Sequence, residues 1–184
     1  MAGIRPEYSF FTKAISELGS WDAPNKWFWN GFGYITPGIL IIWYAFGLFK
    51  SISNGQGSKL PLLSLFLSGG FMVLSGIFPG DFENRRSASM LLHTVGSFGS
   101  YIFFLMAAFS YPSQMRKMAY WKPAIKPTLL FTYLTILFGA WPLLYPSAPG
   151  VGQRLVFFFY FLWIFYTAIK LFKSAKQVPA TSSR

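Results

Sequence analysis

His93 is the only histidine in the sequence and the first candidate for a group that transfers a proton. A general base of this kind needs a carboxylate to orient its ring: Asp81 and Glu83 are the nearest candidates in sequence, and Glu17 is a further candidate through space. Ser16 is the candidate nucleophile, because an activated serine requires a histidine and a carboxylate close to it. Such a set would suit the hydrolysis or transfer of a lipid. The alternative is that His93 hydrogen-bonds a loop carbonyl and that Asp81 only closes a short turn.

Three arginines, Arg85, Arg86 and Arg154, indicate a second kind of chemistry. The planar guanidinium group matches the oxygen atoms of a phosphate and binds them through paired hydrogen bonds. We predict that the three residues lie on one face of the protein and bind the phosphate of a lipid headgroup. In the alternative, Arg85 or Arg86 pairs with Asp81 and Arg154 only caps its loop.

The absence of cysteine and the single histidine narrow the chemistry further. Disulfides, thiolate chemistry and iron–sulfur ligation are excluded, as are a bis-histidine haem and a multi-histidine metal site. The sequence contains neither the glycine-rich phosphate-binding loop of nucleotide hydrolases nor the HExxH pattern of zinc proteases. We therefore predict no metal site and no cofactor.

The elements that must position these residues are long apolar helices. Hydrophobic residues make up 53% of the 184 residues and charged residues 11%, whereas a soluble domain has about 25% charged residues. A membrane-spanning helix needs about 20 mostly apolar residues. Five segments meet that requirement, at residues 32–49, 60–78, 89–111, 128–145 and 155–172. The sequence therefore predicts an all-α, polytopic integral membrane bundle with five spans.

Two flanking segments complete the predicted organisation around this bundle of residues 32–172. Residues 1–31 form an extracytoplasmic segment, with an interfacial helix whose apolar residues recur at helical period up to Gly19. Residues 173–184 form a cytoplasmic tail. This orientation follows from charge: all five acids lie on the N-terminal side of the membrane, whereas the basic residues of the opposite side have no acids among them. The N-terminus is thus predicted outside and the C-terminus inside.

The predicted extracytoplasmic face carries a group of residues that we call the polar cap. Its members are Ser16, Glu17, Asp81, Arg85, Arg86, His93 and Arg154. The net charge of +11 does not indicate a nucleic-acid partner, because the basic residues sit at the ends of apolar runs. We predict membrane lipids as partners, with another membrane protein as the alternative. In a bacterium the membrane would be the inner or plasma membrane.

Several short motifs together resemble the membrane protein family called domain of unknown function 998, over nearly the whole chain. They are Ile-Ser-Glu-Leu-Gly at 15–19, Ala-Pro-Asn at 23–25, Pro-Gly-Ile-Leu at 37–40, Ile-Phe-Pro-Gly-Asp at 77–81, His93, and Gly-Gln-Arg at 152–154. The resemblance implies a six-helix bundle whose first helix precedes the Ser-Glu-Leu-Gly motif, so this chain is expected to lack that helix. A fainter likeness, in the first loop, is to the family of a GPI-anchor remodelling factor and autophagy-linked membrane proteins.

These patterns lead to one functional prediction and two alternatives. The prediction is a non-enzymatic membrane component that binds a lipid headgroup or a partner protein through the polar cap. The first alternative is a membrane-embedded lipid hydrolase or transferase that uses His93 and Asp81. The second is an accessory subunit of a larger complex, for which the face with Gly96, Gly99 and Ser100 would be the smooth, lipid-facing interface.

Overall fold

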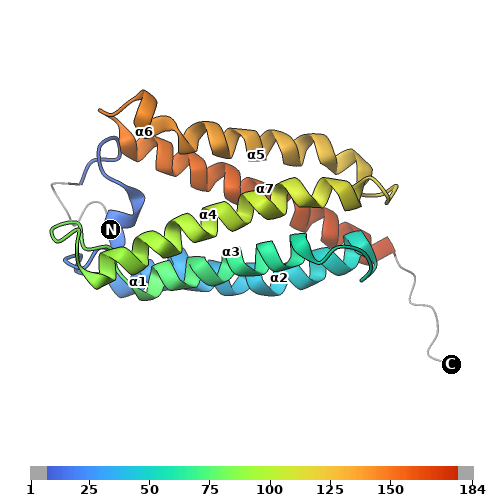
Figure 1. Cartoon of the computed structure of the whole chain (residues 1–184), viewed down its shortest axis with the longest axis horizontal. Helices are drawn as coiled ribbons and strands as arrows, with labels where there is room; N and C mark the ends of the chain where they lie inside the picture. Colours follow the sequence, from blue (N-terminus) through green and yellow to red (C-terminus); the bar gives the residue numbers. More distant parts are fainter. Residues whose placement is uncertain (1–7, 178–184) are drawn as a thin grey trace.

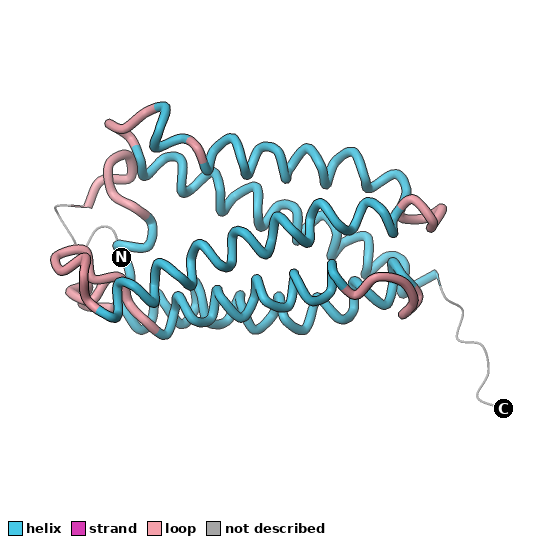
Figure 2. The backbone as a smooth tube through the Cα atoms, viewed as in Figure 1, coloured by secondary structure: helices cyan, strands magenta, loops and turns pink. Residues whose placement is uncertain are grey.

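The computed structural model describes residues 8–177, which form a bundle of helices (Figure 1; Figure 2). The long helices are α2 (Thr36–Ser53), α3 (Leu60–Ile77), α4 (Ala88–Met115), α5 (Ile125–Gly139) and α7 (Pro149–Gln177). The short elements are η2 (Ile15–Gly19), α1 (Lys26–Asn30), η3 (Gly31–Ile35), η4 (Lys122–Ala124) and α6 (Trp141–Leu144). No strand occurs among residues 8–177, so the predicted all-α fold is confirmed. Arg5, Glu7 and residues 178–184 of the predicted flanking segments lie outside the described residues.

Within residues 8–177, four helices are long and apolar enough to cross a membrane. They are Lys26–Ser53, in which α1, η3 and α2 follow one another directly, Leu60–Ile77, Ala88–Met115 and Pro149–Lys176. Large apolar side chains such as Trp43, Phe98 and Phe165 are exposed on them, as expected for helices that face lipid instead of water. The helices therefore have the length and composition of a multi-pass membrane protein.

The predicted fourth span, residues 128–145, was wrong in its limits. The observed helix α5 covers the 15 residues Ile125–Gly139, and α6 follows as a separate short helix. Pro142 accounts for the break, because proline has no N–H to donate to the carbonyl of Phe138 and its ring crowds that carbonyl. A helix of this length spans about 22 Å, less than the hydrocarbon core of about 30 Å. α5 is still part of the bundle and packs along α7 (Figure 1).

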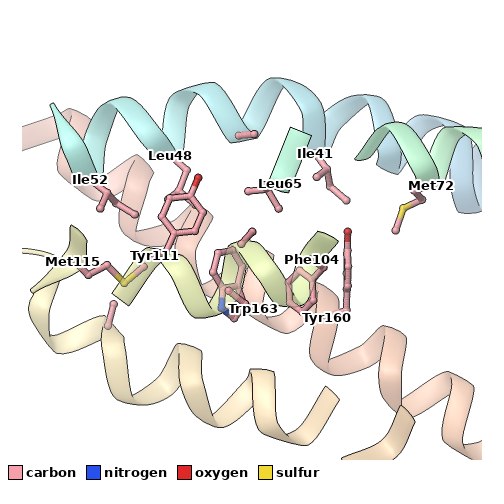
Figure 3. Packing of buried hydrophobic residues seen from close by; sticks show 14 of the residues in the cluster. Ile41, Leu48, Ile52, Leu65, Met72, Phe104, Tyr111, Met115, Tyr160 and Trp163 are labelled. Atoms are coloured by element: carbon pink, nitrogen blue, oxygen red, sulfur yellow. The ribbon is translucent and has the colours of Figure 1, made fainter. Parts of the chain in front are cut away.

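The apolar core lies between α2, α3, α4 and α7. Its side chains fill the bundle toward the end where α2 and α7 end. Figure 3 shows its largest side chains, among them Phe104, Tyr111 and Trp163, which are fully buried. The ring centre of Phe104 lies 4.1 Å from the ring centre of Tyr160 and 5.6 Å from that of Trp163. This packing fixes α4 against α7, and the two cavities described below lie nearer the other end.

Small residues allow α3 to approach its two neighbours closely. A Cβ atom added to Gly38 of α2 would lie 2.6 Å from the carbonyl oxygen of Gly69 of α3, and the reverse distance is also 2.6 Å. On the other side of α3, a Cβ atom on Gly96 of α4 would lie 2.5 Å from the amide nitrogen of Ser75. Helices in membranes gain contact area by this kind of close approach.

The predicted subunit interface on α4 was wrong. Gly96 and Ser100 are buried against α3 of the same chain, and a Cβ atom on Gly99 would lie 2.4 Å from the ring of Phe71. The small residues on this face thus serve the α3–α4 contact, which leaves no smooth surface there for a partner.

Candidate functional site

The polar segments of the sequence meet at one end of the bundle. The N-terminal segment, the loop between α3 and α4, and the turn that joins α6 to α7 lie together where α1 and α7 begin (Figure 1, left). Backbone hydrogen bonds connect them: the amide of Trp21 donates to the carbonyl of Gly80 at 2.9 Å, and that of Gly150 to the carbonyl of Phe11 at 2.9 Å. The structure brings the segments of the polar cap to one place without joining all its side chains in one cluster.

Arg154, in the first turns of α7, is one of the residues that link α7 to the N-terminal segment. Its Nη1 donates to the carbonyl oxygens of Gly150 at 2.7 Å and of Lys13 at 3.0 Å, and its Nη2 donates to the hydroxyl of Tyr8. The guanidinium also lies 5.0 Å from the ring centre of Phe10. No carboxylate among the described residues pairs with it, so its positive charge is held by neutral acceptors and aromatic rings.

Glu17 and Ser16 both have structural partners. Glu17 accepts the amide hydrogen of Ala14 at 2.8 Å and forms an ion pair with Lys13 at 3.1 Å, which closes the start of η2. Ser16 is buried, with its side chain beside Tyr34. The predicted interfacial helix is therefore reduced to the five-residue 3-10 helix η2, although it ends at Gly19 as expected.

Asp81 and the two arginines lie in the same loop, between α3 and α4, but their side chains have different surroundings. The carboxylate of Asp81 accepts the amide hydrogen of Asn84 at 2.9 Å and so closes its own turn. Arg85 and Arg86 are exposed to solvent. Within residues 8–177, no ion pair joins either arginine to Asp81, and no hydrogen bond joins them to Arg154. In the same residues, no group of three carboxylates or imidazoles forms a metal site.

His93 is buried in the second turn of α4 and ties that helix to the end of α3. Its Nδ1 lies 3.0 Å from the carbonyl oxygens of both Ser75 and Phe78, and 3.2 Å from the hydroxyl of Ser75. Because carbonyl oxygens only accept hydrogen bonds, Nδ1 carries the hydrogen. The last carbonyls of a helix lack donors within that helix, and His93 supplies one. No hydrogen bond between His93 and Asp81 occurs in the described part of the chain.

We expect His93→Ala to lower the free energy of unfolding by about 1–3 kcal/mol, because two carbonyls at the end of α3 would lose their donor in apolar surroundings. His93→Asn should retain most of the stability, since its amide donates from nearly the position of Nδ1. Thermal unfolding in a mild detergent measures both variants. A His93→Ala variant that is as stable as the wild type but loses turnover of a lipid would instead assign a catalytic base.

Two residues outside the predicted polar cap hold this end together. The side-chain oxygen of Gln153 accepts the amide hydrogen of Ile15 at 2.6 Å, and the side-chain nitrogen of Asn30 donates to the carbonyl of Gly19 at 2.9 Å. Asn30 is completely buried. The sequence shows only that each of these two polar residues stands at the start of an apolar run. It does not reveal that Asn30 binds a residue 11 positions away, or that Gln153 binds one 138 positions away.

A groove of about 640 Å³ lies between the α1–α2 helix and α7. Its lining is almost entirely apolar and largely aromatic, with Trp29 on one side and Phe157 and Phe161 on the other. Arg154 is the charged residue of the lining, and it lies at the end of the groove next to the N-terminal segment, because it is in the first turns of α7 and binds the carbonyl of Lys13. The groove thus combines an apolar lining with one cation at its polar end.

Comparison with known proteins assigns the family. The family model described as "Protein of unknown function (DUF998)" matches residues 1–170. No curated protein and no solved structure matches the chain. The likeness to the GPI-anchor remodelling family therefore stays a prediction. Because the match extends over nearly the whole sequence, from the N-terminal segment into α7, the chain belongs to the DUF998 family.

Proposed function

We propose that this protein is a non-enzymatic membrane component that binds an anionic lipid, with an acyl chain in the groove and the headgroup at Arg154. The observation that carries this proposal is the half-buried arginine at the polar end of an apolar groove, unpaired with any carboxylate of the described residues. A phosphate or carboxylate headgroup is the complementary charge for such a site.

The shape and lining of the groove suit an acyl chain. Phe32, Phe158 and Phe165 at its rim are exposed, so a lipid tail can enter sideways from the membrane without a large rearrangement. The volume of about 640 Å³ falls within the range of about 300–1,000 Å³ that is usual for small-molecule sites. Contact with aromatic rings on both sides gives the acyl chain more dispersion contacts than it has among other lipid tails.

The hydrogen bonds of Arg154 leave it able to bind an anion. A guanidinium group has five N–H donors, and the bonds to Gly150, Lys13 and Tyr8 occupy three of them. The two that remain, one on Nη2 and one on Nε, can donate to a single headgroup oxygen. Because the three existing bonds also hold the guanidinium in place, little side-chain entropy is lost when the anion binds.

Arg85 and Arg86 have a separate, weaker role in this proposal. Both are exposed in the loop between α3 and α4, which lies at the end of the bundle where α7 begins (Figure 1), and there they attract anionic headgroups to the surface. A basic residue near an anionic membrane surface contributes about 1 kcal/mol. We therefore assign the specific contact to Arg154 and a general electrostatic attraction to the loop arginines.

The orientation inferred for the protein places this end outside the cytoplasm. The opposite end carries Lys50, Lys59, Arg116, Lys117, Lys122 and Lys126, and no acid lies among them. An excess of Lys and Arg in short loops favours the cytoplasmic side. The lipid would then belong to the outer leaflet of the membrane.

The enzyme alternative has less support from the geometry. Asp81 closes its own turn, Nδ1 of His93 is used by the carbonyls of α3, and Ser16 is buried beside Tyr34. Acid, base and nucleophile therefore share no hydrogen bond within the described residues. A hydrolase or transferase would need these groups within hydrogen-bonding reach of one another.

Quenching of Trp29 fluorescence tests the proposal, because this indole lines the groove. The full chain in detergent is titrated with phosphatidylglycerol or phosphatidylcholine whose acyl chains carry bromine, a contact quencher. We expect saturable quenching at a lower concentration of the anionic lipid, and we expect Trp29→Phe to remove the saturable part. Equal quenching by both lipids would contradict recognition of the charge, and quenching unchanged in Trp29→Phe would contradict occupation of the groove.

A further inference from the structure

A second cavity, of about 330 Å³, lies inside the bundle between α3, α4, α5 and α7. It is separated from the groove by Tyr34 and Phe157, which line both spaces and whose ring centres are 6.1 Å apart in an edge-to-face contact. The groove faces the α2 side of α7 and this cavity the α4 side. The two spaces are therefore distinct, although they share a wall.

The lining of this cavity is mostly apolar, with several hydroxyl groups, one amide and no charge. It contains no Asp, Glu, Lys, Arg or His. Its hydroxyl groups belong to two buried networks: Ser75 is bonded to Ser97 at 2.8 Å, and Tyr160 to Ser68 at 2.9 Å. An ionised ligand here would lack a counter-charge in apolar surroundings, and that costs several kcal/mol. The lining thus selects for an uncharged ligand that can form hydrogen bonds.

Gln153 and Tyr101 supply donors for such a ligand. The side-chain oxygen of Gln153 is bonded to Ile15, but its amide nitrogen has no partner among the described residues and is not one of the fully buried unpaired atoms. The hydroxyl of Tyr101 has only a long contact, 3.4 Å, with the carbonyl of Thr135. Two available donors in an uncharged cavity match a ligand with acceptor oxygens, such as the carbonyls of esters.

We infer that this cavity binds an uncharged ester lipid of the diacylglycerol class, with its ester oxygens toward Gln153 and Tyr101 and its chains leaving between α4 and α5. These helices come together near the η4 loop and diverge toward the polar cap (Figure 1). Gly139 lies at that divergence, where an added Cβ atom would be 2.6 Å from the hydroxyl of Tyr101. Because Gly139 has no side chain, the hydroxyl of Tyr101 fits between α4 and α5 at this position.

This inference stands apart from the proposed function, because it concerns a different space and a different ligand charge. The test uses the full chain in phosphatidylcholine nanodiscs with a diacylglycerol that carries a photoactivatable diazirine on one chain. We expect saturable labelling, which unlabelled diacylglycerol displaces and phosphatidylglycerol does not. Peptide mapping should place the label on residues that line the cavity and are not fully exposed, namely Tyr101, Phe138 and Val156.

A matched pair of variants separates the cavity from the surrounding lipid. Val156→Trp fills the cavity and should abolish the saturable labelling, whereas Val95→Trp, at an exposed position of α4, should leave it unchanged. Non-saturable labelling spread over exposed residues would overturn the inference, because it would mean that the cavity holds water instead of diacylglycerol. The wild-type map alone decides the matter if Val156→Trp does not fold.

Discussion

Gly69→Ala should destabilise this protein strongly, whereas Gly70→Ala should leave it as stable as the wild type or slightly more stable. A Cβ atom at residue 69 would lie 2.6 Å from the backbone oxygen of Gly38 and 2.8 Å from Cγ1 of Ile42. The backbone contact cannot be relieved by rotating a side chain, so α2 and α3 would have to separate. Overpacking of this kind costs about 1–3 kcal/mol.

The neighbouring glycine provides the control for this prediction. A Cβ atom at Gly70 would meet nothing within 4 Å, and alanine favours the helix over glycine by up to about 1 kcal/mol. The two variants differ by one position in one helix and are expected to shift stability in opposite directions. Thermal unfolding followed by circular dichroism in a mild detergent measures both shifts. Equal effects of the two substitutions would show that α2 and α3 do not cross at Gly38 and Gly69.

Arg154→Gln should weaken binding of phosphatidylglycerol by at least about 10-fold, because each charge-assisted hydrogen bond to the headgroup contributes about 1.5–3 kcal/mol. Arg154→Lys should fall between this variant and the wild type, since it keeps the charge but loses the planar fork. Replacing both Arg85 and Arg86 by Gln should have a smaller effect that disappears at high salt. The quenching of Trp29 by brominated lipid reports all three affinities.

A second variant distinguishes loss of the anion contact from release of the N-terminal segment. Arg154 also holds Tyr8 and the carbonyl of Lys13, so Arg154→Gln loosens that segment. Gln153→Ala removes the acceptor of the Ile15 amide and loosens the same segment without changing the charge. If Gln153→Ala weakened phosphatidylglycerol binding as much as Arg154→Gln, Arg154 would act only by docking the segment.

The sequence predicts the bundle well because membrane spans leave a strong local signal. About 20 consecutive apolar residues suffice to identify a span, and the lipid environment requires them to be helical. The error at α5 arises because the apolar run continues through Pro142, where the helix does not. An apolar run measures transfer into lipid, whereas the limits of a helix depend on backbone hydrogen bonds.

The candidate site is less predictable, since its partners are distant in sequence. An even number of bundle helices separates each polar segment from the next, so all of these segments reach the same end of the bundle. The number of apolar runs in the sequence already predicts this arrangement. That Arg154 binds the carbonyl of Lys13, and that Gln153 binds the amide of Ile15, depends on how the segment folds back on α7. The groove and the cavity depend on how each helix is rotated and tilted, which an aromatic-rich sequence leaves nearly unspecified.

Native mass spectrometry of the protein, extracted gently from its own membrane, shows whether an anionic lipid is bound. We expect a reproducible added mass of one anionic lipid on the wild type, and loss of that mass from the Arg154→Gln variant. A stoichiometric protein companion with no bound anionic lipid would contradict lipid binding at Arg154 and make the polar cap an interface with that companion.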